Sequence, residues 1–395
     1  MDGELTPALD RELIADCVHC GFCLPTCPTY GLWHEEMDSP RGRIHLMDAL
    51  ADGSLELTDA VAEHFDRCLG CMACVTACPS GVRYDRLIEQ TRALVEREHR
   101  RPLAQRLLRA AIFGVLPHRR RLRVALALRA LPAPPPLRAL KRLAPPWSSS
   151  AWPPVHLPGG GPRVALLAGC VQSVVFGDVN AATARVLAAD DFDVHVPRAQ
   201  QCCGALHAHA GRPQEGVART RALAGALSGY DHIVTNAAGC GSHLKDHGIE
   251  NAVDISELIT APRAQRRPLE LSVAFQDSCH LRHAQGLVSE PRAMLAQVPG
   301  LRVLEAAEPD ICCGSAGIYN IVQPQAATEL GDRKAQRVLE TGADAYVSAN
   351  PGCLVQVSAA LRRAGRPLPA FHPIELLDAS IRGVDPAQLL KEARR

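Results

Sequence analysis

The sequence has few aromatic residues, which make up 4% of its 395 positions, and it has no long apolar run. No stretch approaches the roughly eighteen consecutive apolar residues of a membrane-spanning helix, so none is predicted. The first residues, "MDGELTPALDRELIADC", are acidic and lack an apolar core and a small-residue cleavage site, which predicts no secretory signal. The formal net charge is only +1, and this composition predicts no nucleic-acid binding.

A dinucleotide-binding fingerprint is also missing. No G-x-G-x-x-G opens a helix after a strand, and the glycines of "LPGGGPR" (157–163) precede a strand and are typical of a linker. We therefore expect neither FAD nor NAD on this chain.

Cysteine is abundant, with 16 residues that fall into four groups of four. A secreted disulfide scaffold is usually a short chain, whereas clustered cysteines in a long chain without a signal indicate metal or redox chemistry. The groups are Cys17, Cys20, Cys23, Cys27; Cys68, Cys71, Cys74, Cys78; Cys170, Cys202, Cys203, Cys240; and Cys279, Cys312, Cys313, Cys353.

The first two groups, "CVHCGFCLPTCP" and "CLGCMACVTACP", both follow C-x2-C-x2-C-x3-C-P, the spacing of bacterial ferredoxins. Structural zinc also takes four cysteines, but this spacing is not that of a zinc ribbon. In two-cluster ferredoxins the cysteine before proline ligates the other cluster. Two [4Fe–4S] clusters are therefore predicted. The ligand sets are Cys17, Cys20, Cys23 and Cys78 for cluster 1, and Cys68, Cys71, Cys74 and Cys27 for cluster 2.

The C-terminal half repeats itself. The segments "RVALLAGC", "FDVHVP" and "DHIVTNAAGC" look like strands, and "LSVAFQDSC", "LRVLEAA" and "DAYVSANPGC" follow in the same order about 110 residues later. Helical stretches lie between them, which predicts a short parallel sheet in each copy. The fold class is therefore α+β overall, with a mainly helical two-cluster ferredoxin domain followed by two repeated α/β domains.

Cysteines follow the predicted strands in both copies, as single residues or as a Cys-Cys-Gly pair. Ligands gather beyond the carboxyl ends of parallel strands, so each copy is expected to bring four thiols to one rim. The possible third site comprises Cys170, Cys202, Cys203 and Cys240, and the possible fourth comprises Cys279, Cys312, Cys313 and Cys353. Gly204 and Gly314 would let the backbone pass a bulky cluster. The predicted domains are 1–98 (ferredoxin type), 99–160 (basic helical and Pro-rich linker), and 161–268 and 269–395 (the Cys-Cys-Gly domains).

The ferredoxin groups, "DSPRGRIHLMDAL", "QCCGALHAHAG", "NAAGCGSHLK", "CCGSAGIYN" and "SANPGC" together resemble the iron–sulfur subunits of glycolate oxidase. The Cys-Cys-Gly half also resembles lactate-utilisation proteins, a glycerol-3-phosphate dehydrogenase subunit and heterodisulfide reductase subunits. The resemblance implies an electron carrier with FAD-binding dehydrogenase partners that oxidise glycolate to glyoxylate. With no secretory signal and with the basic segment at 100–142, the chain is expected to be cytoplasmic and peripheral on the inner face of the cell membrane. Electrons would pass toward the quinone pool. D-lactate or glycerol-3-phosphate oxidation, thiol–disulfide chemistry and a structural-metal scaffold are the alternatives.

One departure concerns the repeats. The heterodisulfide reductase type carries a fifth cysteine per copy, where this sequence has His243 and Gln356. Four cysteines suffice for a cubane, so one or two further clusters are expected in the repeats. His243 is a possible ligand or a hydrogen-bonding neighbour, and His209 and His283 are candidates for handling protons near a quinone.

Residues 100–142 hold twelve Lys or Arg and no acidic residue, interleaved with leucine and alanine at helical spacing. A basic amphipathic helix can lie on anionic lipid, dock on an acidic partner, or pack on its own chain.

In the earlier "DSPRGRIHLMDAL", Arg41 and Arg43 are predicted either to contact cluster sulfurs or to anchor the two ferredoxin lobes.

Overall fold

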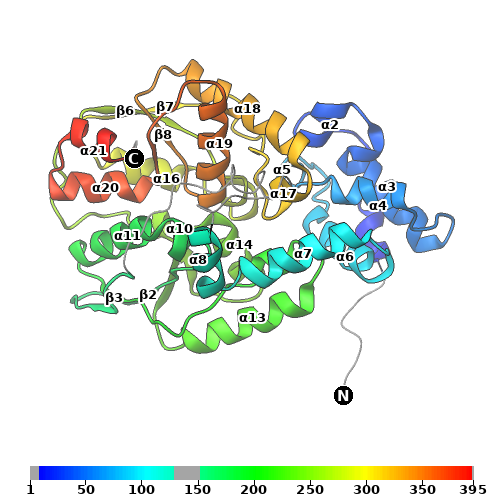
Figure 1. Cartoon of the computed structure of the whole chain (residues 1–395), viewed down its shortest axis with the longest axis horizontal. Helices are drawn as coiled ribbons and strands as arrows, with labels where there is room; N and C mark the ends of the chain where they lie inside the picture. Colours follow the sequence, from blue (N-terminus) through cyan, green and yellow to red (C-terminus); the bar gives the residue numbers. More distant parts are fainter. Residues whose placement is uncertain (1–8, 129–151, 394–395) are drawn as a thin grey trace.

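The computed structural model of the protein describes residues 9–128 and 152–393 (Figure 1). A small helical region at the N-terminal side lies against a larger α/β part. None of the helices within these ranges combines the length and hydropathy that a membrane crossing requires. The prolines predicted to mark the linker, at positions 132, 134, 135, 136, 145 and 146, and the basic residues from 129 to 142 lie outside the described ranges.

The N-terminal region is helical. Its elements are α1 (Arg11–Ala15), α2 (Pro28–Trp33), η1 (Glu36–Asp38), α3 (Pro40–Asp52), α4 (Asp59–Asp66), α5 (Ala73–Thr76) and α6 (Tyr84–Glu98). Ser39 caps α3 by accepting a hydrogen bond from the Gly42 amide, with proline at the first helical position. Met47, Phe65 and Leu87 form the centre of its core, so α3, α4 and α6 hold the two cysteine loops together.

Two further helices, α7 (Leu103–Val115) and α8 (Arg119–Ala127), confirm the helices predicted in the basic segment. The α7 helix buries Ile112 and Phe113 but leaves Leu103 and Leu107 largely exposed, at 67% and 61%. Apolar side chains one helical turn apart therefore face outward beside the arginines.

The first repeat contains a five-stranded sheet of order β1-β3-β2-β4-β5, parallel except for β1. Its elements are β1 (His156–Leu157), β2 (Arg163–Leu166), α10 (Gln172–Val175), α11 (Gly177–Ala189), β3 (Asp193–His195), α12 (Ala205–Ala208), α13 (Pro213–Ala226), β4 (His232–Thr235), α14 (Ala238–Asp246), β5 (Ala252–Asp254) and α15 (Ile255–Leu258). Because β1 precedes residue 161, this sheet recruits a strand from the segment predicted to be linker.

The second repeat has a four-stranded, fully parallel sheet of order β7-β6-β8-β9. Its elements are β6 (Leu271–Phe275), η3 (His280–Ala284), α16 (Ser289–Ala296), β7 (Leu301–Glu305), α17 (Tyr319–Val322), α18 (Pro324–Glu340), β8 (Ala345–Val347), α19 (Pro351–Arg363), β9 (Ala370–Phe371), α20 (Pro373–Arg382) and α21 (Pro386–Ala393). This order matches β3-β2-β4-β5, so the predicted fold class and internal repeat are confirmed.

The two repeats share one hydrophobic core. It contains Val164 and Leu166 of the first sheet together with Val273 and Phe275 of the second. Helices α11 and α20 pack against each other between the sheets (Figure 1), and the Arg185 guanidinium donates to both Asp378 oxygens at 2.8 and 2.7 Å. The repeats therefore fold as one packed unit, which fixes the positions of their cysteine rims.

Candidate metal centres

The two ferredoxin loops have the same backbone shape. His19 and Gly70, each just before the second cysteine of its loop, have φ of 53° and 65°. Gly21 and Met72, each just after it, have φ of 87° and 64°. Left-handed residues on both sides of a cysteine curl the chain into a concave turn, a shape that suits iron–sulfur sites.

The ligands predicted for cluster 1 converge. A single pocket is lined by Cys17, Cys20, Cys23 and Cys78, with Cys74 also at its wall. Burial raises the pKa of Cys23 to about 11. The last cysteine of the second loop thus joins the first three of the first loop, which is the exchange expected of a two-cluster ferredoxin fold.

The cysteines predicted for cluster 2 also lie together. Burial raises the pKa of Cys71 and Cys74, and the neighbouring Cys68 and Cys27 raise both pKa values further. Thiolates packed this closely repel one another and need a compensating cation. A cationic iron–sulfur core bound by thiolates supplies that charge, so the donor set fits the predicted group.

A buried arginine lies beside this second set. Arg43 donates to the His64 carbonyl, to Thr29 and to Asp38, at 2.7, 3.2 and 3.3 Å. Burial would raise the pKa of Cys68, but Arg43 and Arg92 lower it. Arg43 therefore both ties the ferredoxin helices together and offers positive charge to the thiols.

Arg41, two residues earlier, is placed differently. It pairs with Glu36 at 2.6 Å and donates to the His19 carbonyl, and its side chain is 31% exposed. It supports the first cysteine loop from outside.

In the first repeat, the four cysteines meet beyond the carboxyl ends of the strands. The Cys170 thiol contacts that of Cys202, and the Cys203 thiol contacts those of Cys202 and Cys240. Contact with Cys202 and burial together raise the pKa of both Cys170 and Cys203. The predicted rim of four thiols is thus present as a compact group.

The second repeat forms the equivalent group. The Cys279 and Cys312 sulfurs lie 3.9 Å apart, and Cys313 contacts Cys312 and Cys353. The Asn350 side-chain amide donates to the Cys353 sulfur at 3.5 Å. Each group can offer four thiolates to one metal centre.

The glycine after each vicinal pair is required by geometry. Gly204 and Gly314 have φ of 103° and 85°, in the left-handed region that favours glycine. A Cβ on Gly204 would lie 2.4 Å from the Gly216 carbonyl oxygen, and one on Gly314 would lie 2.8 Å from that of Ala327. Helix α13 in the first repeat and helix α18 in the second thus pack directly against the Cys-Cys-Gly backbone.

His243 and Gln356, which stand where the fifth cysteines would be, bond to helices α13 and α18. His243 Nε2 lies 2.9 Å from the Thr220 hydroxyl, and burial lowers the pKa of His243 to about 3. The Gln356 amide donates to the Ala327 carbonyl at 2.6 Å. His243 is thus a neutral hydrogen-bonding neighbour in this structure, the second of the two roles considered for it.

The two other histidine candidates lie between domains. His283 Nδ1 lies 2.8 Å from the Thr76 hydroxyl, which joins the second repeat to the ferredoxin loop. His209 Nδ1 lies 3.4 Å from a carboxylate oxygen of Glu89 on α6. No sequence pattern singled out Glu89 or His280, whose ring centroid is 5.1 Å from that of His209. The role of His280 could have been inferred from its position directly after Cys279.

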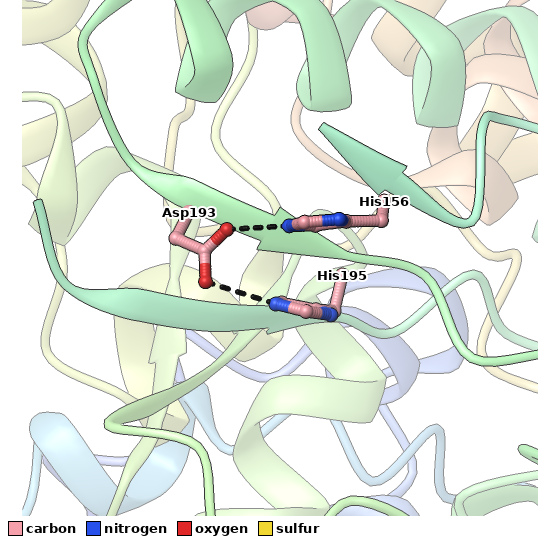
Figure 2. A group of neighbouring side chains, drawn as sticks. All are labelled: His156, Asp193 and His195. Carbon is pink, nitrogen blue, oxygen red and sulfur yellow. Dashed lines mark hydrogen bonds and ion pairs between the residues drawn. The ribbon is translucent and has the colours of Figure 1, made fainter. Parts of the chain in front are cut away.

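A separate trio of potential ligands lies on the first sheet (Figure 2). Asp193 accepts from His156 and His195, with oxygen–nitrogen distances of 2.6 and 3.0 Å, and the two imidazoles stack. All three ligand atoms lie within 4.8 Å of one another. Arg163 adds a cation 3.6 Å from the same carboxylate. Hydrogen bonds and charge pairing therefore account for this arrangement.

The ferredoxin region and the second repeat are continuous in their packing. Cys71 and Cys312 belong to the same hydrophobic cluster, with Leu69 and Tyr319, and Cys279 packs against it. Cys312 is also the neighbour that raises the pKa of Cys71 most after burial itself. The second ferredoxin thiol set and the second repeat's thiol set are therefore adjacent.

Known families match the same three parts of the chain. The 4Fe-4S dicluster domain matches residues 13–82, and the Cysteine-rich domain matches residues 164–245 and 273–358. Over its whole length, the chain is 34% identical to the "Probable glycolate oxidase iron-sulfur subunit" of Bacillus subtilis and covers 97% of it. The chain belongs to the glycolate oxidase iron–sulfur subunit family. The Escherichia coli "Glycolate oxidase iron-sulfur subunit" is 36% identical, over 95% of this chain and 96% of that protein.

Membership of this family supports an iron–sulfur electron-transfer subunit of an oxidoreductase. Wider relatives include "Lactate utilization protein A" of Oceanobacillus iheyensis, 25% identical over 55% of this chain and 98% of that protein. A crystal structure of a hypothetical protein from Helicobacter pylori has the same fold, with a TM-score of 0.53 at 10% identity, over 89% of this chain and 69% of that one.

Proposed function

We propose that the chain is the iron–sulfur subunit of a flavin-dependent dehydrogenase that oxidises glycolate to glyoxylate, with substrate oxidation on FAD-binding partner subunits. Electrons from the flavin would leave through this chain toward quinone. The proposed ligands are the two ferredoxin sets for two [4Fe–4S] clusters and the four-thiol rims of the repeats for one or two further clusters. When bound, such clusters supply one-electron redox chemistry.

The observation that carries this proposal is the adjacency of thiol sets that lie far apart in the sequence. The cluster 1 pocket includes Cys74, a cluster 2 ligand, and the cluster 2 residue Cys71 packs with Cys312. An electron carrier needs such neighbouring redox sites, whereas a scaffold with structural metal does not.

We also propose that the chain is cytoplasmic and binds the inner face of the membrane through its basic segment. Leu103 and Leu107 on α7 are exposed, and the arginines of α8 include the exposed Arg120 and Arg121. Exposed leucines beside arginines suit an anionic lipid surface, where each cation contributes about 1 kcal/mol.

The test is anaerobic co-purification of the tagged chain with its flavoprotein partners. Iron and sulfide analysis is expected to give about eight irons if the ferredoxin clusters alone are bound, and twelve or more if the repeats are also filled. Electron paramagnetic resonance of the dithionite-reduced protein should show interacting clusters. Glycolate should reduce a soluble dye through the complex, and a colourless zinc protein would refute the proposal.

The second candidate is oxidation of D-lactate or glycerol-3-phosphate by an equivalent complex. It is favoured by the match to "Lactate utilization protein A", which spans 55% of this chain. The same dye assay with each substrate separates these candidates. Heterodisulfide-type chemistry is less favoured, because His243 and Gln356 bond to helices α13 and α18 at the positions of the fifth cysteines.

A further inference from the structure

The second repeat buries a lysine that has no acidic partner. The side chain of Lys334 on α18 has no exposed surface, and its Nζ donates to the Glu308 carbonyl oxygen. Within the part of the chain that the structure describes, no carboxylate pairs with Lys334, because the Glu308 carboxylate is bound by Arg333 and Arg337. A buried charge is normally paired with an opposite one, so this ammonium group needs an anion close by.

The thiol group of the second repeat lies on the same side of α18. Leu330, one helical turn before Lys334, packs in the same hydrophobic cluster as Cys312. Ala335, the next residue, packs in the cluster of Cys313. Burial lowers the pKa of Lys334, whereas Cys313 and Cys312 raise it. Four thiolates outweigh the positive charge of an iron–sulfur core, so a centre bound here would be the missing anion.

The first repeat has no lysine at the equivalent place. The carbonyl oxygens of Gly216 and Ala327 lie against the two Cys-Cys-Gly glycines, which makes these two positions equivalent. Seven residues further along each helix stand Leu223 and Lys334. Leu223 is buried in the hydrophobic cluster of Cys203. An apolar side chain therefore faces the first thiol group where an ammonium faces the second.

A weaker cation does act on the first thiol group. Contact with Cys170 and Cys203 lowers the pKa of Cys202, and Arg219 adds a smaller effect in the same direction. Arg219 is partly exposed, so solvent screens its charge far more than that of the buried Lys334.

The second repeat also has a hydrogen-bond donor that the first lacks. Helix α19 packs beside α18 (Figure 1), and its N-cap residue Asn350 donates to the Cys353 sulfur at 3.5 Å. The N-cap of the equivalent helix α14 is Ala237, whose side chain has no donor. Asn236, one residue earlier, donates to side chains of α11 instead. Charge and hydrogen bonding thus both distinguish the two thiol groups.

Both differences act on reduction in the same direction. The potential of an iron–sulfur centre depends on its net charge and on hydrogen bonds to its sulfurs. Reduction adds an electron to a centre that is already anionic, so a buried cation and a donor to sulfur stabilise the reduced form.

We propose that Lys334 and Asn350 make the metal centre of the second repeat easier to reduce than that of the first, so that the second repeat receives the electrons that leave cluster 2. This inference rests on the proposed function, which assigns clusters to the repeats, and it adds the order of the centres. Each step moves one electron from reduced cluster 2, which is reoxidised, to the oxidised centre of the second repeat. The packing of Cys71 with Cys312 gives this transfer its route.

The experiment is an anaerobic redox titration of the cluster-loaded complex, followed by electron paramagnetic resonance. Lys334→Met keeps an unbranched side chain of similar length and removes the charge. A unit charge within about 10 Å, at an effective dielectric constant of about 20, changes the ratio of reduced to oxidised centre roughly tenfold. One midpoint potential should therefore fall by about 59 mV, the value of a tenfold change for a one-electron couple.

Two further variants identify the centre. Cys353→Ser removes a proposed ligand of the second repeat and should abolish or alter the same signal. Asn350→Ala removes the donor to that sulfur and should lower the same ratio about threefold.

Two control variants should leave every midpoint potential unchanged. Leu223→Met alters the matched position of the first repeat without changing charge. Lys391→Met removes a lysine from the exposed end of α21.

Unchanged midpoint potentials in both Lys334→Met and Asn350→Ala, with the iron content of the parent, would overturn the proposal. A complex in which Cys353→Ser loses neither signal nor iron would also overturn it, because the second repeat would then hold no centre. A signal that Cys240→Ser abolishes should titrate at a lower potential than the one assigned to the second repeat, and the reverse order would contradict the inference. Should Lys334→Met lose iron, Asn350→Ala still decides.

Dye reduction by glycolate is measured on the unsubstituted complex alongside. If that activity is absent while the expected shift is found, the proposed function fails and the order of the centres stands. If the activity is present without the shift, the inference about Lys334 and Asn350 alone fails.

Discussion

The buried arginine of the ferredoxin region gives the most direct test of how this domain is held together. Arg43→Gln removes a guanidinium that is 1% exposed and faces Asp38, which is fully buried. Breaking a buried pair from one side costs about 3–5 kcal/mol. In the variant Asp38 still has Arg67 at 2.9 Å and His64 at 3.0 Å as partners. Because its charge is not left alone, the lower end of that range is expected.

The measurement is urea unfolding of the cluster-loaded chain under anaerobic conditions, followed by iron analysis. Arg43→Gln should lower the free energy of unfolding by about 3 kcal/mol. Because Arg43 also lowers the pKa of Cys68, its loss should lower the midpoint potential of the cluster that we assign to this thiol set. A redox titration followed by electron paramagnetic resonance reports that shift.

Arg41→Gln is the control on the same helix. Arg41 makes a single ion pair, with Glu36, and lies at the surface. Its replacement should destabilise the chain far less than Arg43→Gln. Equal losses in the two variants, or an unchanged stability for Arg43→Gln, would refute the reasoning.

Three further predictions concern the repeats and the basic segment. Gly314→Ala should destabilise the chain by about 1–3 kcal/mol and lower its iron content, since φ is 85° and the new Cβ would clash with a carbonyl. Gly342→Ala is the control: its Cβ would meet open space, so this variant should keep its iron. Burial raises the pKa of Glu375 from 4.5 to about 7, so the folded chain favours the protonated carboxyl. This contribution to the free energy of unfolding is fully present below pH 4.5 and is lost as the pH rises through 7. Glu375→Gln should therefore gain stability relative to the parent between pH 5 and pH 8 in urea unfolding, and a constant difference would contradict this. Replacing Arg120 and Arg121 by Gln should weaken binding to anionic liposomes in a sedimentation assay, and an equally strong effect on neutral vesicles would argue against an electrostatic contact.

The sequence predicted β2, β3, β4, β6, β7 and β8 because each lies in an apolar run that a cysteine follows within a few residues. The strands β5 and β9, of three and two residues, were not predicted. No cysteine follows either of these segments, and their extended shape depends on pairing with β4 and β8. The same holds for β1, which pairs with the distant β3 and, at two residues, is too short to be recognised alone.

The thiol groups were predicted because cysteine spacing is itself the signal. The residues around them were harder to find. Glu89 meets His209 across α6 and the first repeat, and Arg43 reaches Cys68 through a helix packing that no local pattern encodes. Contacts of this kind follow from how the domains dock, and docking depends on the whole surface of each domain.

The shared cluster of Cys71 and Cys312 has a kinetic consequence under the proposed function. Transfer between those two sites is a first-order event inside one folded chain, so its rate is independent of protein concentration and unaffected by dilution. Only the arrival of electrons from the flavoprotein and their departure to the acceptor are encounters between molecules. Crowding, salt and membrane composition would therefore act on the two ends of the path and leave its middle unchanged.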